Sequence, residues 1–516
     1  MKLSGHICID GSQPSTLEAG WITYGWCLAD RPLRRLIFEP ETGDPRPAWV
    51  GLSRPDLPAV FPQHPHAGQA GFLMLLQGGE PAVSVPPRGQ WWCEDASGGW
   101  WQLPVSALPR VPAAFACENP TIPPVALTQA ASRNDDVEAR LRMGIAASRG
   151  LTLRLDITNK CNLRCVMCHY QSDDVFRRPA QHVTPEQFEI WFAEVSPLVG
   201  EVMLSCADEP LVSRHFADII RLIRRLHAGV EIKFCTNATL MTEPIRRLLV
   251  EQQVDLIVIS LDGCTEATFE AIRTGARFER VVSHVLALDD LRRRAGSRRP
   301  EIVTNFVMMR RNLHEAPPFV TMARRLGAST VDFRHVVASY EGFDLQAEQL
   351  KQSPGRYNFY RERLLALGAE QGMKLYLPPA FAHAGQWTPD ATEPVATLVD
   401  FDAVAARFAP DPVVPTIPMN APAPRLANWL HLPDLFADTF CPRPFSEIMI
   451  REQAEIMPCP WHARPLGNLA KTPRLLEAFF GEEFRRLRSQ MLRPEGDEHC
   501  RSCPLKLKEL PSERFS

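Results

Sequence analysis

The chain has 516 residues and a formal net charge of −3, from 57 basic and 60 acidic side chains. This length allows several domains with buried cores, and the near balance of charge gives no reason to expect nucleic acid or an anionic membrane as a partner. The first residues lack the apolar core of a signal peptide, and no run approaches the about 20 apolar residues of a membrane span, so we expect a cytoplasmic protein. Thiols stay reduced in the cytoplasm, so clusters among the 14 cysteines indicate metal binding or catalysis more than disulfides.

Residues 1–145 have the pattern of a small all-β module. They hold seven of the eleven tryptophans, many prolines and glycines, and short alternating apolar runs. Alternation with a period of two, interrupted by turn residues, is typical of β-strands with one buried face. The pairs Trp91-Trp92 and Trp100-Trp101 could stack on sugars, although aromatic residues in small β-sandwiches belong to the core far more often.

The same region resembles a β-sandwich accessory module that occurs in bacterial glycosyltransferases and methyltransferases. The resemblance lies in Gly25-Trp26, Arg54-Pro55-Asp56-Leu57, Phe61-Pro62 and Gly71-Phe72. It implies a sandwich-like fold for this module and favours a saccharide or nucleotide-sugar substrate.

From residue 151 strand-like and helix-like segments alternate regularly. A helix opens at Thr184, which is the N-cap residue; Pro185 occupies the first turn and Gln187 completes a capping box. The six predicted strands lie at residues 153–157, 201–205, 231–236, 256–260, 302–308 and 330–335. Further amphipathic helices are predicted near residues 214–227, 242–252, 278–294 and 313–326. This alternation predicts an α/β fold, a partial (β/α)6 TIM-like barrel over residues 150–340, with ligands at the carboxyl ends of the strands.

Residues 341–440 are predicted to form a bridge. The bridge begins with a helix around residues 357–369 and then becomes proline-rich, as in Pro410–Pro415. We expect part of it to line or cover the active site. Residues 441–516 then predict a small C-terminal domain, with a β-hairpin over 447–457 and a helix over 472–491.

The most specific motif of the chain is the spacing of Cys161, Cys165 and Cys168, directly after the first predicted strand. With 14 cysteines in 516 residues, chance would give roughly 0.01 such matches. Three thiolates can hold three irons of a cubane and leave the fourth iron open to a ligand. Zinc also binds thiolates, but a closed zinc site needs a fourth ligand. The adjacent His169 could supply that ligand only in a sterically poor arrangement.

This motif, with Met167 as the apolar residue before the last cysteine, resembles the signature of radical S-adenosylmethionine (radical SAM) enzymes. The resemblance covers residues 150–340 and implies a SAM-binding [4Fe-4S] cluster on the three cysteines. In that family the open iron chelates the amine and carboxylate of SAM, and an electron from the cluster splits SAM into methionine and a 5′-deoxyadenosyl radical. The radical then removes a hydrogen atom from the substrate.

Other segments match this family by their position after successive strands. The run from Ala207 to Pro210 stands where the family has Gly-Gly-Glu-Pro, with the glycines replaced. Ser260 and Asp262 match the segment that meets the ribose or the methionine carboxylate, and a guanidinium such as that of Arg273 suits the carboxylate. Each residue alone is as often a turn or cap residue. The cofactor contacts that the resemblance implies are Met167, Ala207, Asp208, Glu209, Ser260, Asp262, Arg273 and Asn305.

A second group of cysteines lies near the C-terminus. Its members are Cys441, Cys459, Cys500 and Cys503. Four thiolates can close a metal site completely, and the spacing alone fits a zinc knot and an iron-sulfur cluster equally well.

This second group resembles the twitch domain, a shortened relative of the SPASM domain, in many radical SAM enzymes. The segments Cys459-Pro460 and Gly467-Asn468, followed by a predicted helix, share the likeness. The resemblance implies one auxiliary [4Fe-4S] cluster beside the SAM-binding cluster. A fully ligated cluster suits electron transfer, which fits an oxidation in which the cluster accepts the remaining electron.

Three scattered cysteines lie near the predicted mouth of the barrel: Cys235, Cys206 and Cys264. A thiol there could return a hydrogen atom to a substrate radical and so turn oxidation into epimerisation. A lone cysteine is more commonly a small buried hydrophobe, so these residues are weak catalytic candidates, and the sequence identifies no base.

The sequence therefore predicts a radical SAM oxidoreductase or modifying enzyme with two [4Fe-4S] clusters and SAM. A sugar or another small molecule is the favoured substrate, with a peptide maturase or an epimerase as the alternative. We also expect an external electron donor such as flavodoxin or ferredoxin. A hypothesis of another class is a non-catalytic iron-sulfur or zinc binding protein, in which the altered turn at Ser205–Asp208 marks lost SAM binding.

Overall fold

The structure is a computed structural model of the chain, and it divides into two compact units, one mainly of residues 1–151 and one mainly of residues 152–516. Each unit is described by itself. Cys206, Cys441 and Cys503 lie outside the described residues. The described residues are 2–14, 21–41, 45–52, 57–76, 89–104, 112–117, 151–205, 207–336, 339–340, 343–389, 394–407, 410–417, 443–460, 462, 464–471, 474–491 and 497–501.

The N-terminal unit is built on one eight-stranded sheet with the order β7-β6-β3-β4-β5-β2-β1-β8, and its pairings are antiparallel. The strands are β1 (Leu3–Pro14), β2 (Trp21–Ala29), β3 (Leu33–Pro40), β4 (Arg46–Leu52), β5 (Gly71–Leu76), β6 (Gly89–Asp95), β7 (Trp100–Leu103) and β8 (Ala113–Cys117). The first part of β4 pairs with β3, through Arg46 and Ala48, and its second part pairs with β5, from Trp49 to Leu52. One strand therefore links two halves of the sheet, and a common core packs between residues of both halves.

The tryptophan pairs of this unit contribute to packing. Trp91 and Trp101 are fully buried, and Trp92 is 5% exposed. The ring of Trp92 packs against Ile37 and Trp100, and its Nε1 donates a hydrogen bond to Glu39. The hypothesis that these pairs form a sugar-stacking platform is therefore not supported, because their rings face neighbouring side chains.

The second unit contains a ten-stranded sheet with the order β17-β14-β13-β12-β11-β10-β9-β18-β19-β20. The strands are β9 (Leu151–Leu155), β10 (Val199–Leu204), β11 (Glu231–Thr236), β12 (Leu256–Ser260), β13 (Glu301–Met308), β14 (Thr330–His335), β17 (Lys374–Tyr376), β18 (Glu447–Ile450), β19 (Glu455–Met457) and β20 (Gly467–Asn468). The pairings from β10 to β14 are parallel. The six predicted strands correspond to β9 to β14, with ends that differ by at most two residues.

The parallel sheet is wider than the predicted six strands, because β17 pairs in parallel with β14 and β18 pairs in parallel with β9. The three residues of β17 are too short for a visible period of two. The pairing of β18 with β9 joins residues almost 300 positions apart, which a local pattern does not reveal. The predicted hairpin is confirmed, since β18 pairs antiparallel with β19.

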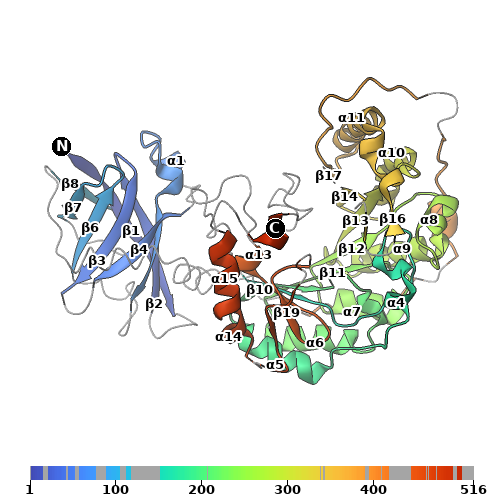
Figure 1. Cartoon of the computed structure of the whole chain (residues 1–516), viewed down its shortest axis with the longest axis horizontal. Coiled ribbons are helices and arrows are strands. Elements are labelled where there is room, and N and C mark those ends of the chain that lie inside the picture. Colours follow the sequence, from blue (N-terminus) through green and yellow to red (C-terminus); the bar gives the residue numbers. More distant parts are fainter. Residues whose placement is uncertain are drawn as a thin grey trace. The chain divides into compact units, whose positions relative to one another are not determined.

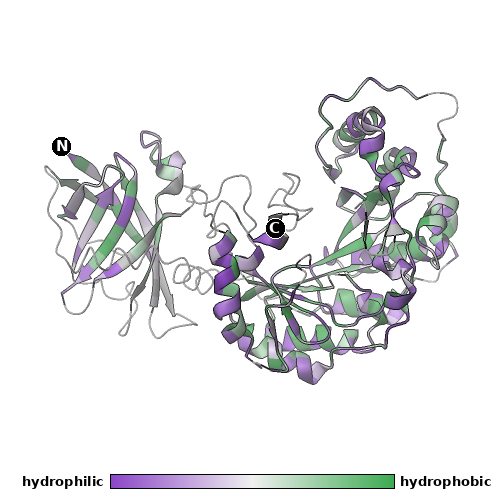
Figure 2. Ribbon diagram, in the orientation of Figure 1, coloured by the Kyte–Doolittle hydropathy of each residue, from purple (hydrophilic) through white to green (hydrophobic). Residues whose placement is uncertain are grey.

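Seven helices of the second unit follow strands of the sheet, and Figure 1 shows the curved sheet with helices along its outer side. They are α5 (Pro185–Val195), α6 (Phe216–Leu226), α7 (Glu243–Glu251), α8 (Glu266–Ile272), α9 (Phe278–Arg294), α10 (Ala316–Arg325) and α11 (Pro354–Gln371). The capping box at α5 is confirmed: Gln187 N donates to Thr184 Oγ1, and Thr184 N donates to the Gln187 side chain. The outer helices carry hydrophilic residues along one side, as expected for amphipathic helices (Figure 2).

The remaining elements are short. They comprise the 3-10 helices η1 (Ala67–Gln69), η2 (His169–Gln171), η3 (Pro210–Val212), η4 (Leu313–Glu315), η5 (Gln346–Glu348) and η6 (Leu350–Gln352), the helices α1 (Leu57–Val60), α4 (Asp173–Phe176) and α12 (Phe401–Ala405), and the strand pair β15 (Ser339–Tyr340) and β16 (Phe343–Asp344). Within the described part of the chain, no helix combines the length and apolar character needed to cross a membrane.

The C-terminal helices differ from the prediction. Beside the small helices α13 (Arg443–Ser446) and α16 (Glu498–Arg501), the predicted helix over 472–491 is two helices, α14 (Leu475–Phe479) and α15 (Glu482–Met491). The break falls at Gly481, where a Cβ would lie 2.8 Å from the Glu477 carbonyl oxygen. Glycine is a poor helix former, so the chain turns there instead of continuing.

The described part of the proline-rich bridge packs on the helix layer. Arg246 on α7 forms two hydrogen bonds with Asp411, at 2.6 and 2.7 Å, and Arg325 on α10 binds Asp402 at 2.9 Å. Ile417 N donates to the carbonyl of Glu251 at 3.0 Å. These residues tie outer helices together, whereas Leu345, near the start of the bridge, packs in one apolar cluster with Val166 and Met167 of the cysteine loop.

Candidate functional site

The loop that carries Cys161, Cys165 and Cys168 follows β9 and is anchored on both sides by backbone hydrogen bonds. Val166 N donates to the Ile272 carbonyl at 2.9 Å, and Arg164 N donates to the Thr274 carbonyl at 3.0 Å. On the other side Glu209 N donates to the Lys160 carbonyl at 3.0 Å. The loop after β10 and the end of α8 therefore hold the cysteine loop at the carboxyl edge of the sheet.

The three thiols are set in a largely buried environment. Cys165 is 7% exposed, while Cys161 and Cys168 are half-buried. Burial raises the pKa of Cys161 to about 12 and that of Cys165 to about 11, because a thiolate loses its hydration there. Thiolates at this site need a compensating positive charge, and a metal centre supplies one.

The donor set fits a cubane with one open iron. Each of three thiolates can bind a different iron, and no fourth protein ligand is required. Among the described residues, no three His, Cys, Asp or Glu side chains converge on a point where a single ion could be held. Zinc would need such convergence, whereas a cubane needs thiolates that are spread over its corners.

Arg273 and Asp262 form a buried ion pair directly beside Cys165. The Nη2 of Arg273 lies 2.7 Å from Asp262 Oδ2, and its Nη1 lies 3.8 Å from Cys165 Sγ. Asp262 is fully buried and accepts a hydrogen bond from Val307 N at 2.7 Å. The sequence predicts both residues as SAM contacts, but the structure places them against each other and behind a cluster cysteine.

Glu209 is similarly engaged by the protein. Its carboxylate accepts hydrogen bonds from Thr236 Oγ1 and Asn237 N, each at 2.7 Å, and from Leu211 N at 3.2 Å. Burial raises its pKa to about 7, although these hydrogen bonds act in the opposite direction. Asn237 in turn lies with its Nδ2 3.9 Å from Cys161 Sγ. Glu209 thus fixes the loop after β11 beside the first cysteine, and sequence reasoning did not single out Asn237.

Asp208 belongs to a separate polar network. Tyr170 donates its hydroxyl proton to Asp208 Oδ1, and Arg178 donates to Asp208 Oδ1 at 3.1 Å and to the Tyr170 hydroxyl at 3.2 Å. Burial and the nearby Asp156 raise the pKa of Asp208 to about 8. Asp156 also accepts a hydrogen bond from Ala207 N at 3.2 Å. The network therefore fixes the turn that replaces the Gly-Gly-Glu-Pro segment.

Ser205 shows how this turn works without the family's glycines. Its φ is +133°, a conformation that favours glycine, so the backbone there is strained. The side chain compensates, because its Oγ accepts from Cys235 N and donates to the Cys235 carbonyl, both at 3.1 Å.

The remaining predicted cofactor contacts gather at the same edge. Ser260 and Asn305 are paired across β12 and β13, and Asn305 is 9% exposed. Met167 packs against an apolar cluster that includes Ile272 and Met309. The structure therefore brings these predicted residues to the edge where the cysteine loop lies.

The candidate hydrogen donors differ in position. Side chains along β14 alternate between the two faces of the sheet, and Phe333 packs against Phe319 of the outer helix α10. Residues 332 and 334 therefore lie on the opposite, inner face of the sheet. Cys235 lies within range of Arg334 and Arg154; these charges lower its pKa, but burial dominates and raises it to about 11. Cys264 is fully buried and its Sγ contacts the Glu315 carbonyl at 3.7 Å, which fits a structural cysteine.

The described part of the second cysteine group also comes together. His462 N lies 3.4 Å from the Cys459 carbonyl, and Cys500 N donates to Asp497 Oδ1 at 3.2 Å. His462 Nε2 and Asp497 Oδ1 lie 3.8 Å apart, so the two cysteine segments meet. No motif in the sequence indicates His462. Cys441 and Cys503, the other members, lie outside the described residues.

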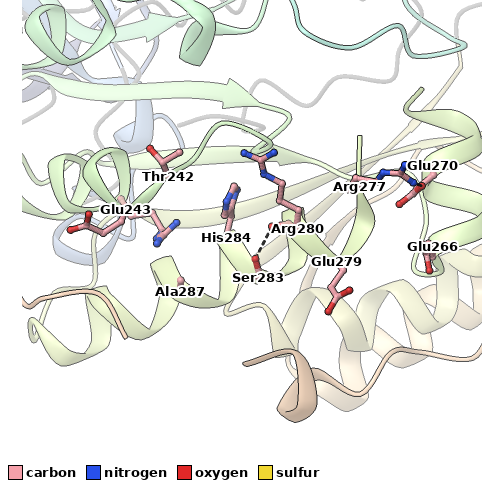
Figure 3. A pocket seen from close by; sticks show the side chains of 11 residues that line it. Thr242, Glu243, Glu266, Glu270, Arg277, Glu279, Arg280, Ser283, His284 and Ala287 are labelled. Carbon is pink, nitrogen blue, oxygen red and sulfur yellow. Dashed lines mark hydrogen bonds and ion pairs between the residues drawn. The ribbon is translucent and has the colours of Figure 1, made fainter. Parts of the chain in front are cut away.

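A cavity of about 650 Å³ lies between α7, α8 and α9, and Figure 3 shows its lining. His284 and Arg280 lie between Thr242 and Glu243 at one end and Arg277 and Glu270 at the other. Arg277 pairs with Glu270 at 2.8 Å, and Ser283 donates to the Arg280 carbonyl. None of the predicted cofactor residues lines this cavity, so the cysteine loop remains the candidate cofactor site.

Comparison with known families agrees with this geometry. Residues 155–320 match the model of the radical SAM superfamily, and residues 441–504 match that of an iron-sulfur cluster-binding domain, SPASM. The chain therefore carries a radical SAM domain with its mostly parallel α/β sheet, followed by a SPASM domain. Together the two domains imply SAM and [4Fe-4S] clusters as cofactors.

Individual relatives match only part of the chain. A tungsten-containing aldehyde ferredoxin oxidoreductase cofactor-modifying protein of Pyrococcus furiosus is 27% identical over 192 residues, which is 35% of this chain and 49% of that protein. Mycofactocin maturase MftC of Mycobacterium tuberculosis is 30% identical over 199 residues, 38% of this chain and 48% of that protein. The chain thus spans about half the length of these curated relatives. The chain is also similar in structure to Streptococcus suis SuiB bound to S-adenosylmethionine. The superposition covers 74% of this chain and 76% of the SuiB chain, with a TM-score of 0.48 and 13% sequence identity.

Proposed function

We propose that the chain is a radical SAM modifying enzyme that oxidises its substrate with the help of an auxiliary cluster. The observation that carries this proposal is the anchored loop that presents three thiols at the carboxyl edge of a parallel sheet. When bound, the cluster and SAM supply a 5′-deoxyadenosyl radical that removes a hydrogen atom from the substrate.

The protein's own residues hold and orient this machinery. Backbone bonds from Val166 and Arg164 fix the cysteine loop, and Glu209 fixes the neighbouring loop beside Cys161. Ser260 and Asn305 lie side by side on β12 and β13, and we infer that they contact the ribose of SAM. The wall of packed strands and helices keeps water from a reactive centre.

The SPASM segment supports the oxidative form of the reaction. Four thiolates can saturate an auxiliary cluster, which then accepts an electron without binding the substrate. Cys459 and Cys500 lie on segments that meet through His462 and Asp497, in agreement with a shared site. An external flavodoxin or ferredoxin would deliver the electron that starts each cycle.

The substrate class follows less directly. The strands of the sheet carry polar ion pairs, Arg154 with Glu447 and Arg334 with Asp332, and such a polar surface favours a polar or charged small molecule. The preference for a sugar loses one support, because three of the four paired tryptophans, Trp91, Trp92 and Trp101, are buried in the N-terminal unit. A maturase or epimerase is the second candidate, favoured by the position of Cys235 on the inner face and by the similarity to mycofactocin maturase.

Cleavage of SAM tests the proposal. Anaerobically reconstituted protein incubated with dithionite and SAM is expected to form 5′-deoxyadenosine and methionine, measured by chromatography. The triple variant Cys161→Ala/Cys165→Ala/Cys168→Ala is expected to form none above background. Cys93→Ala, which removes a buried thiol of the N-terminal unit, is the control and should retain cleavage. Intact SAM beside a reduced wild-type cluster would favour the non-catalytic binding protein instead.

A further inference from the structure

Arg273 is positioned by its backbone as well as by its side chain. It follows the last residue of α8, and the carbonyls of its neighbours Ile272 and Thr274 accept hydrogen bonds from Val166 N and Arg164 N of the cysteine loop. The residue therefore sits between two backbone bonds that tie it to the loop. These backbone bonds hold the Cα of residue 273 beside the cysteine loop, and a substitution of the side chain leaves them in place.

The guanidinium has little freedom. Arg273 is 6% exposed, and its partner Asp262 is fully buried. Asp262 is itself held, because Val307 N donates to its carboxylate and Asn312 Nδ2 donates to its carbonyl at 2.9 Å. Moving the guanidinium away would leave a buried carboxylate without its countercharge, which is strongly unfavourable.

The donors of Arg273 are not fully used by the protein. The contact with Asp262 is a close ion pair rather than a well-aligned hydrogen bond, and Nε is buried without a hydrogen-bond partner. Nη1 points to Cys165 Sγ at 3.8 Å. A buried donor without an acceptor is costly, so the arrangement indicates an acceptor that is present when the site is filled.

A sulfur acceptor fits the charge of this arrangement. The ion pair lies with its positive end toward the cysteines, and the positive charge of Arg273 interacts with Cys165, Cys168 and Cys161. A reduced cluster carries one more negative charge than the oxidised cluster, so a fixed cation and N–H donors near its sulfurs favour the reduced form. A guanidinium can serve Asp262 and a sulfur at once because its N–H groups fan out in a plane.

We propose that Arg273, held by Asp262, is a positioning residue that donates to the sulfur of Cys165 and raises the reduction potential of the cluster on Cys161, Cys165 and Cys168. The inference rests on the proposed function, since it concerns the same cluster. It differs from the assignment that the sequence suggested, in which Arg273 binds the carboxylate of SAM.

A redox titration without SAM tests this role. The anaerobically reconstituted full chain is poised at a series of potentials, and the reduced cluster is measured by electron paramagnetic resonance. Arg273→Met is expected to reduce the ratio of reduced to oxidised cluster at least tenfold at a given potential, which for a one-electron couple is a shift of about 59 mV to more negative values. Arg273→Lys, which keeps the charge but not the planar fork, should give a smaller shift in the same direction.

Two matched controls isolate the effect of position. Arg224 is 5% exposed and pairs with Asp255 at 2.8 Å, and Arg246 is 8% exposed and pairs with Asp411. Arg224→Met and Arg246→Met remove equally buried guanidinium groups that do not contact the cysteine loop, so the potential should stay at the wild-type value. Addition of SAM identifies the relevant signal, because only a cluster with an open iron responds to it.

The outcomes separate the alternatives. An unchanged potential with weakened SAM binding in Arg273→Met overturns the proposal in favour of a SAM carboxylate ligand. Loss of the cluster from both Arg273 variants, with iron retained in the controls, overturns it as well, because Arg273 would then assemble the site instead of tuning it. If Arg273→Met shows the expected shift in potential but the wild-type protein never cleaves SAM, the proposed function is overturned and this inference stands.

Discussion

Glu209 and Asp262 show how a side chain at a cofactor site can serve the protein itself. Their positions after β10 and β12 were predictable, because each follows a recognisable strand and belongs to a motif. Their partners were not, since Thr236, Asn237 and Arg273 come from other segments and periodicity carries no information about such pairings. The cysteines of the loop after β9 differ from these residues, because their spacing is visible in the sequence alone.

Replacement of Glu209 tests whether its carboxylate holds the loop after β11 in place. Glu209→Gln replaces one of the two carboxylate oxygens by an NH2 donor, so either Thr236 Oγ1 or Asn237 N loses its acceptor, and a buried donor without its acceptor costs about 1–3 kcal/mol. We expect a lower thermal midpoint and less bound iron, while protein that retains its cluster still binds SAM. Glu189→Gln, an exposed carboxylate on α5, should change neither quantity. Normal iron with greatly weakened SAM binding would instead identify Glu209 as a cofactor ligand.

At the scale of elements, local pattern located the long helices and the six central strands. Local pattern did not locate α8, a helix of only seven residues, or the break at Gly481. The added parallel strands β17 and β18 are short, and their pairing with β14 and β9 depends on contacts far along the chain. Very short helices and strands therefore contain too few residues to show the regular spacing of apolar residues by which a sequence indicates them.

The turn between β6 and β7 provides a prediction at this scale. The buried Asp95 accepts hydrogen bonds from Ser97 N, Gly99 N and Trp101 Nε1, at 2.9, 3.0 and 3.1 Å. Burial raises its pKa, but these hydrogen bonds outweigh that effect and lower the pKa below its usual range. A lowered pKa in the folded state gives stability that is present above the ordinary value of about 4 and is lost as the pH falls through the folded value.

Asp95→Asn should therefore destabilise the N-terminal unit at pH 7 by about 1–3 kcal/mol and flatten the loss of stability below about pH 4. Tryptophan fluorescence during denaturant unfolding of the full chain measures this, because seven of the eleven tryptophans lie in residues 1–145. Asp30→Asn, at an exposed position, is the control. Identical pH profiles for wild type and Asp95→Asn would contradict the assignment.

For the whole molecule, the order of the two cysteine groups along the chain predicted a radical SAM domain followed by an auxiliary cluster domain, and the family matches agree. The predicted boundaries at residues 145, 340 and 440 remain predictions. In the bridge, Asp411 pairs with Arg246 of α7 and Asp402 pairs with Arg325 of α10. The proline-rich composition of the bridge did not indicate these contacts with outer helices.

Metal analysis tests the number of clusters in the whole molecule. The reconstituted wild type is expected to hold about eight irons and eight sulfides, on the stoichiometry of two [4Fe-4S] clusters. The triple variant Cys161→Ala/Cys165→Ala/Cys168→Ala and the double variant Cys459→Ala/Cys500→Ala should each retain about four. Zinc in place of iron in the triple variant would show that the C-terminal cysteines form a zinc knot.

The pairing of β18 with β9 has a mechanical consequence. Glu447 of β18 binds Arg154 of β9 at 2.6 Å, and Asp156 N donates to the Ile450 carbonyl at 3.0 Å. The strand that leads into Cys161 and the hairpin that leads into Cys459 are thus neighbours in one hydrogen-bonded sheet. Paired strands resist sliding past each other, so in the proposed function two clusters held after these strands would stay at a nearly constant separation.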